Sequence, residues 1–146
     1  DSRVLSYAHF WSDAAQRRLQ EVIAAAKAAK SSGDKEKFAK LETQLNDLQA
    51  KLHLQVFSTG PAEEALAALK DRLPQLQKEA KVDRLVSKWD AAALRQYATA
   101  EKVDVTDLLT REFKPKEKQL KVIESIKTQK PLSLDECKEL IKKGEI

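Results

Sequence analysis

The apolar residues of the first part of the chain form two heptad stripes that mirror each other. Those between positions 15 and 29 are spaced 4-3-4-3, and those between positions 38 and 52 are spaced 3-4-3-4. The sequence Ser31-Ser32-Gly33-Asp34 between them supplies the turn and capping residues that end one helix and begin another. An antiparallel helical hairpin turned at Gly33–Asp34 would place each stripe residue opposite another. This predicted seam consists of Ala15, Leu19, Val22, Ala26, Ala29, Phe38, Leu41, Leu45, Leu48 and Leu52.

Small and large side chains alternate across the predicted seam. Three of its pairs place an alanine opposite a larger residue, which favours close approach of two helices: Ala15 with Leu52, Ala26 with Leu41, and Ala29 with Phe38. Two helices of about 20 residues each would make an arm roughly 30 Å long. Because an alanine-rich seam buries little area, we expect the arm to need a base, further helices or other copies of the chain for stability.

The base of the predicted hairpin carries aromatic residues. The mirror pattern continues outward to place Trp11 opposite Val56 and Phe10 opposite Phe57. Three segments rich in β-branched residues are typical of short strands: Arg3–Tyr7, Val82–Trp89 and Val103–Thr106. The predicted fold is therefore mainly α within the α+β class, an antiparallel helical hairpin on a small base sheet. Beside the four residues above, the predicted base or assembly residues are Leu85, Val86, Trp89, Val103 and Val105.

The last third of the chain predicts two short helices. Pro115 opens the first, whose inward residues are predicted to be Leu120, Ile123 and Ile126, and Pro131 ends it. Ser133 with Glu136 forms a capping box for the second. We therefore divide the chain into residues 1–113, a hairpin with a small sheet, and residues 114–146, a C-terminal two-helix extension.

Composition and charge exclude several classes of protein. Three glycines, four prolines and 5% aromatic residues disfavour a β-sandwich, and no apolar run of about 18 residues predicts a membrane span. The net charge of +4 is spread thinly, which is typical of a solvated surface of mixed charge. Glu117 interrupts the densest basic stretch, Lys114–Lys121, which also lacks aromatic residues, so we predict no nucleic-acid binding.

No motif of catalysis or of cofactor binding occurs in the chain. One cysteine and two histidines do not suffice for a Cys/His zinc site, although His9 and His53 near the base of the hairpin are weak candidates for a metal contact. The region around Trp89, Asp90 and Asp104 is a weak candidate for a ligand pocket. The prediction is a protein without enzymatic activity and without a cofactor.

Two segments give the chain a likeness to a known family. Val82-Asp83-Arg84-Leu85-Val86, followed by Val103-Asp104-Val105-Thr106-Asp107-Leu108-Leu109, resembles the OmpH/Skp-like periplasmic chaperones, as does the layout of residues 1–113. The resemblance implies a trimeric β-rich base with hairpin arms that hold unfolded outer-membrane proteins without ATP. The chain begins at Asp1 and contains no methionine, which leads us to expect a periplasmic or otherwise extracytoplasmic protein after removal of a signal peptide.

The leading hypothesis is a holdase-like, protein-binding protein that acts through its hairpin arm and forms a homo-oligomer. The first alternative is a scaffold module that binds a folded partner through its helices. The second alternative is a small domain that binds a ligand or a metal.

Overall fold

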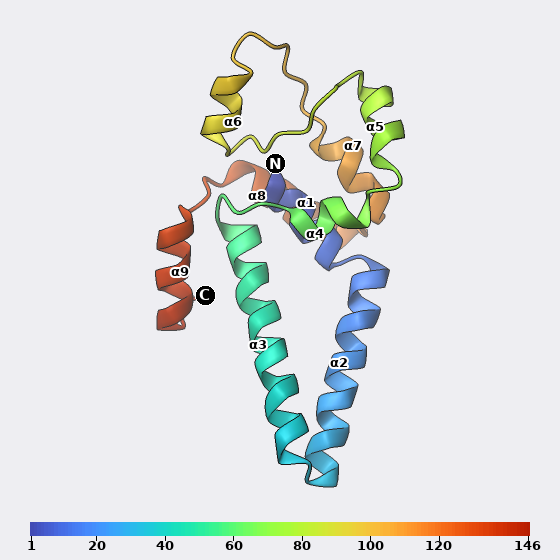
Figure 1. The fold of residues 1–146 in the computed structure, drawn as a ribbon, viewed down its shortest axis with the longest axis vertical. Helices are drawn as coiled ribbons and strands as arrows, with labels where there is room; N and C mark the ends of the chain where they lie inside the picture. Colours follow the sequence, from blue (N-terminus) through green and yellow to red (C-terminus); the bar gives the residue numbers. More distant parts are fainter.

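The computed structural model describes residues 1–146 and is 70% helical, with nine α-helices and no strand. Figure 1 shows a long hairpin below, a group of short helices above, and α1 and α8 between them. The elements are α1 (Ser2–Phe10), α2 (Asp13–Ser32), α3 (Lys35–Phe57), α4 (Glu63–Ala68), α5 (Leu73–Ala80), α6 (Ala91–Gln96), α7 (Thr106–Thr110), a 3-10 turn (Arg111–Phe113), α8 (Glu117–Thr128) and α9 (Leu134–Lys143).

The predicted base sheet is wrong. Arg3–Tyr7 lies inside α1, and Val82–Trp89 is a loop. The third predicted strand, Val103–Thr106, is a loop that ends where Thr106 begins α7. In the first case the helix period was missed because the window is short: Val4, Leu5 and Ala8 share one helical face, and Asp1 caps the helix by accepting the N–H of Arg3 at 3.1 Å. In the other two segments, β-branched residues favour an extended backbone, but no neighbouring strand is present to form the hydrogen bonds of a sheet.

Helix α1 is the centre of the packing. Val4, Leu5 and Ala8 are each no more than 5% exposed. Leu5 belongs to a cluster that joins α1 to α4, α5 and α7, formed by Leu5, Ala62, Ala65, Leu69, Leu76 and Leu109. Val4 and Ala8 belong to a second cluster that joins α1 to α3 and α8, together with Val56, Ile123 and Ile126. A nine-residue helix thus takes the place that the sequence analysis gave to a sheet.

The hairpin of α2 and α3 turns where the sequence predicts. Gly33 ends α2 in the left-handed conformation, with φ at +75°, which glycine adopts without steric cost. Asp34 begins α3, and its carboxylate accepts the backbone N–H of Lys37 at 3.0 Å. We call residues 13–57 the arm, and it forms the narrow lower end of the molecule in Figure 1.

The two C-terminal helices pack back on the rest of the chain. Ile123 and Ile126 of α8 are buried against α1, whereas Leu120, predicted to point inward, is 46% exposed. Helix α9 has the predicted capping box of Ser133 and Glu136, and its fully buried Cys137 lies against α3, with Sγ 3.6 Å from the carbonyl oxygen of His53. The C-terminal extension therefore contributes to the core that the hairpin and α1 share.

Candidate protein-binding arm

Burial along the seam changes from the turn to the body. Near the turn, Ala26 and Ala29 are buried. Nearer the body, Leu19 and Val22 are half-buried, and Leu48 is 41% exposed. Figure 1 shows the same trend in the backbone, because α2 and α3 lie closest at the turn and diverge toward the body. Of the remaining seam residues, all are half-buried: Ala15, Phe38, Leu41, Leu45 and Leu52.

The divergence of α2 and α3 toward the body has a physical reason in the side-chain pairs of the seam. The two pairs nearest the turn join an alanine to a larger residue, and the next two, Val22 with Leu45 and Leu19 with Leu48, join two large residues that hold helices farther apart. The structure supports the register at the turn, where Lys30 Nζ lies 5.6 Å from the centre of the Phe38 ring. Leu52 packs instead against the cluster that contains Val56.

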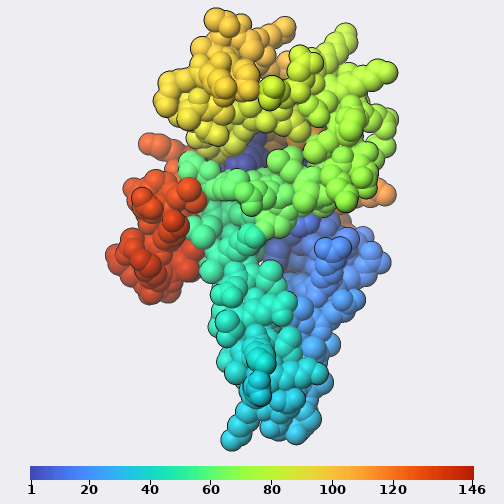
Figure 2. All heavy atoms as spheres, in the orientation of Figure 1, coloured from blue at the N-terminus to red at the C-terminus, as the bar shows by residue number.

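Few other elements cover the arm. Helix α9 packs on the part of α3 nearest the body, and α1 contacts the ends of both arm helices there. In the space-filling view of Figure 2 the turn half of the arm projects free of every other element. Only α2 and α3 shield the seam over that length, and each edge of the seam faces solvent. A two-helix arm thus leaves apolar surface available to another chain.

The base aromatics do not close the hairpin on each other. Trp11 is 41% exposed and meets the rings of Phe10 and Tyr7, at centre-to-centre distances of 5.2 and 6.3 Å. Phe57 is also 41% exposed and meets His53. The position between them is filled by α1 and α8, whose apolar residues surround the buried Val56. This packing of α1 between the two aromatic residues was not predicted, because residues 3–7 were expected to form a strand.

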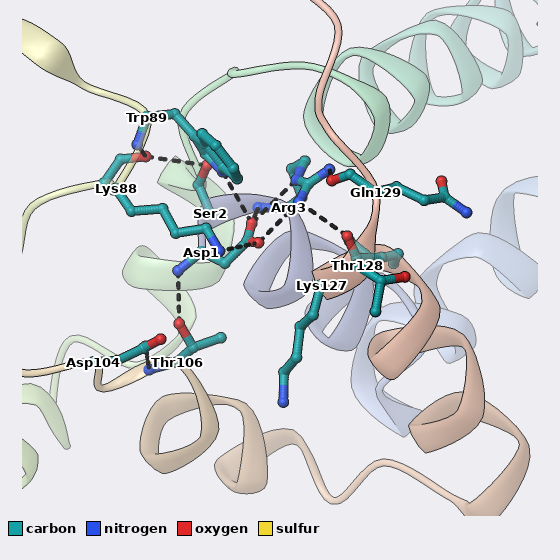
Figure 3. Close-up of polar contacts among 12 residues, drawn as sticks. Asp1, Ser2, Arg3, Lys88, Trp89, Asp104, Thr106, Lys127, Thr128 and Gln129 are labelled. Carbon is teal, nitrogen blue, oxygen red and sulfur yellow. Dashed lines mark hydrogen bonds and ion pairs between the residues drawn. The ribbon is translucent and has the colours of Figure 1, made fainter.

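A buried ion pair anchors α1 at the base of the arm. The side chains of Asp1 and Arg3 are 1% and 2% exposed and lie 3.0 Å apart (Figure 3). Arg3 donates to the carbonyl oxygens of Ile126 and Gln129, both at 2.9 Å, at the C-terminal end of α8. A cation suits this end of a helix, where carbonyl groups lack intrahelical partners.

Trp89 and Lys88 complete the same polar cluster. The Trp89 indole N–H donates to the Asp1 carboxylate at 3.1 Å, and Lys88 Nζ lies 3.0 Å from it. Arg3 and Lys88 both lie against the Trp89 ring, 4.8 and 4.7 Å from its centre. The amino group of Asp1 donates to Thr106 Oγ1 at 2.6 Å. Every charge here has a partner within the chain, so the cluster ties α1, α7, α8 and the 82–90 loop together. Arg3 was not predicted as a functional residue, and its only signal in the sequence is a charged residue next to Val4 on α1.

The remaining predicted base residues divide between core and surface. Leu85 and Val105 pack against the cluster that contains Leu5. Val86 and Val103 are 38% and 49% exposed.

The two histidines lie in separate surroundings. His9 is half-buried and its ring meets the Phe113 ring edge-on, 5.4 Å between centres, whereas His53 lies against Phe57. No group of three or more His, Cys, Asp or Glu side chains is placed to hold a metal ion. Burial, and next the positive charge of Arg18, lower the pKa of His9.

The lowered pKa of His9 predicts a pH-dependent stability. In the unfolded chain the pKa returns to about 6.5, so unfolding takes up a proton below that pH. Neutral His9 makes its full contribution to the free energy of unfolding above about pH 6.5. This contribution is lost as the pH falls toward the pKa of His9 in the folded state. We expect the free energy of unfolding, measured with urea at several values between pH 5 and pH 7.5, to fall less in His9→Gln than in the wild type. Equal falls in the two proteins would contradict the prediction.

Three carboxylates in this region of the chain, Asp90, Asp104 and Asp107, make local contacts. Asp90 caps α6 by accepting the N–H of Ala93, and Asp104 accepts the N–H of Thr106, both at 2.9 Å. Asp107 pairs with Lys127 at 2.7 Å.

Burial raises the pKa of the Cys137 thiol, which keeps it protonated. Two surface hollows, of about 570 Å³ along α5 and about 700 Å³ along α2, are each lined by six residues of which one is hydrophobic.

Neither the apolarity of the helices nor comparison with known proteins points to a specific function. No helix in the structure combines the length and the apolarity that crossing a bilayer requires. Models of known families, curated proteins and solved structures were all compared with the chain, and none matches it. The geometry of the arm is therefore the basis for a functional proposal.

Proposed function

We propose that this protein is a non-enzymatic, holdase-like binding protein whose arm takes up apolar segments of other polypeptides. The observation that carries the proposal is the partly exposed seam of the arm. Leu48 is 41% exposed, and its seam neighbours Leu19 and Leu45 are half-buried. A segment with apolar side chains would cover this surface and gain free energy in proportion to the area removed from water.

The base sheet plays no part in this proposal. A trimer built on paired strands has no strands to build on, so the proposed binding rests on the arm of each chain. Whether several copies surround one client stays a prediction, as does an extracytoplasmic location. Sedimentation of the purified protein measures the first of these directly.

The alternative is a scaffold that binds a folded partner through its helices, and the C-terminal helices give it less support than the arm does. Ile123, Ile126 and Cys137 of α8 and α9 are buried within the chain and are not available to a partner. These helices leave Leu120, Val122 and Leu134 exposed, whereas the partly covered seam of the arm is a continuous stripe on two helices.

The proposal predicts that Leu48 contributes to client binding. A chemically denatured outer-membrane protein, diluted into buffer with a stoichiometric amount of this protein, should scatter less light than alone. Leu48→Gln should weaken the suppression several-fold, because covering the exposed part of a leucine contributes on the order of 1 kcal/mol. The matched control is Leu134→Gln on α9, which changes a leucine that is 38% exposed outside the seam.

Two results would argue against the proposal. The first is an absence of suppression by the wild-type protein at a stoichiometric ratio. The second is a loss with Leu134→Gln that equals the loss with Leu48→Gln. Circular dichroism of the wild type and of both variants excludes unfolding as the cause of either result.

A further inference from the structure

The turn end of the arm carries a concentration of positive charge that the proposed function does not use. We call residues 27–40 the tip. It holds five lysines against Asp34 and Glu36, a net charge of +3, and the lysines are Lys27, Lys30, Lys35, Lys37 and Lys40. The rest of the arm, residues 13–26 and 41–57, holds three basic and four acidic residues, a net charge of −1. The excess positive charge of the arm is therefore located at its tip.

Four of the tip lysines have no carboxylate partner. Lys40 pairs with Glu36 at 2.7 Å, which uses one of the two acidic side chains. The other, Asp34, accepts the backbone N–H of Lys37 as the cap of α3. Lys30 lies over the Phe38 ring, and Lys27, Lys35 and Lys37 are exposed without an ion pair. Both tip carboxylates are thus engaged, and the unpaired cations face solvent.

The tip lysines are close enough together for their fields to add. Lys27 and Lys40 lie on the last turns of α2 and the first turns of α3, each about 10 Å along its helix from Gly33. This distance is comparable to the Debye length of roughly 8 Å at physiological ionic strength. A flexible anionic partner that approaches the turn meets several lysines at once.

We propose that the tip is a docking point for acidic polypeptide segments, which it guides to the apolar seam. This inference rests on the proposed function, since it assigns the kind of client that the arm selects. The side chains of the tip favour a polypeptide over other anionic partners. The tip has no arginine for bidentate contact with phosphate, and its one aromatic ring, Phe38, is half-buried beside Lys30 and so is not free to stack on a base. No large apolar side chain of the tip is exposed for insertion into a bilayer.

The test compares two variants of equal charge. The tip variant changes Lys27, Lys30, Lys35 and Lys37 to Gln, and the control variant changes Lys78, Lys118, Lys130 and Lys143, which are exposed and unpaired outside the arm, to Gln. The probe is a fluorescein-labelled, flexible peptide in which glutamate alternates with glycine and serine, measured by fluorescence anisotropy at low salt. A peptide with glutamine in place of glutamate serves as its neutral counterpart.

We expect the wild type to bind the glutamate peptide, to release it as NaCl is added, and not to bind the glutamine peptide. The tip variant should bind at least tenfold more weakly, and the control variant within about twofold of the wild type. An equal loss in both variants would overturn the proposal, because net charge alone would then explain the binding. Tighter binding of single-stranded oligothymidylate or of phosphatidylglycerol vesicles than of the peptide would overturn it as well.

The outcome separates this inference from the proposed function. If the tip variant still suppresses aggregation and peptide binding does not depend on the tip, only the docking role fails. If no client is protected while the glutamate peptide binds at the tip, the holdase role fails and the tip remains a site for acidic segments.

Discussion

Replacing Arg3 with methionine is expected to lower the free energy of unfolding by about 3–5 kcal/mol, because the change leaves the buried Asp1 carboxylate without its main partner. The same change removes the two hydrogen bonds to the last carbonyl groups of α8 and the contact with Trp89. Urea unfolding followed by circular dichroism measures the loss.

The control for Arg3 is an ion pair at the surface. Arg72 lies 3.1 Å from Glu112 but is 51% exposed, so Arg72→Met should cost no more than about 1 kcal/mol. Adding Asp1→Asn to Arg3→Met should cost less than the sum of the two single changes, because the remaining partner is no longer a buried charge. Similar losses for Arg3→Met and Arg72→Met would show that the cluster is not an anchor.

A second large effect is expected at Ile123. This residue is 1% exposed in the cluster shared by α1, α3 and α8, so Ile123→Ala should lower the free energy of unfolding by about 2–5 kcal/mol. Leu120→Ala on the same helix is the matched control. Its side chain is 46% exposed, so removing it should cost less than about 1 kcal/mol.

This pair of variants tests the packing of α8 directly. If Leu120→Ala were as costly as Ile123→Ala, the helix would present the face that its sequence alone suggested, with Leu120, Ile123 and Ile126 all inward. If neither change were costly, α8 would not contribute to the core. The unfolding transition of each variant, measured under the same conditions, distinguishes these cases.

The helices with strong local signals could be predicted from the sequence. The two heptad stripes, the turn at Gly33–Asp34 and the capping box at Ser133 depend on contacts between residues close in sequence, and each is found in the structure. The same locality explains the error in α1, because its Val-Leu pair within a short window fits a strand as well as a helix. The local sequence pattern does not predict the exposure of Leu120 either, because this exposure depends on where α1 and α3 lie.

The candidate site shows the same division. The residues of the seam follow from their spacing, and the size of the paired side chains sets part of their graded exposure. The rest depends on α1 and α8, which pack around Val56 at the base of the arm. The lysines of the tip can be counted in the sequence, whereas their freedom from ion pairs depends on which carboxylates come near them in space.

By itself the sequence determined the hairpin, its turn and the seam, because periodicity and capping act within a few residues of each other. Only the tertiary structure decided that a short helix rather than a sheet occupies the centre, that Asp1, Arg3 and Trp89 meet there, and that Leu48 remains open to solvent. These outcomes depend on contacts between segments up to 126 residues apart in the chain, such as Arg3 with Gln129. Local patterns carry no information on such contacts, since any of several packings would satisfy the same apolar stripes.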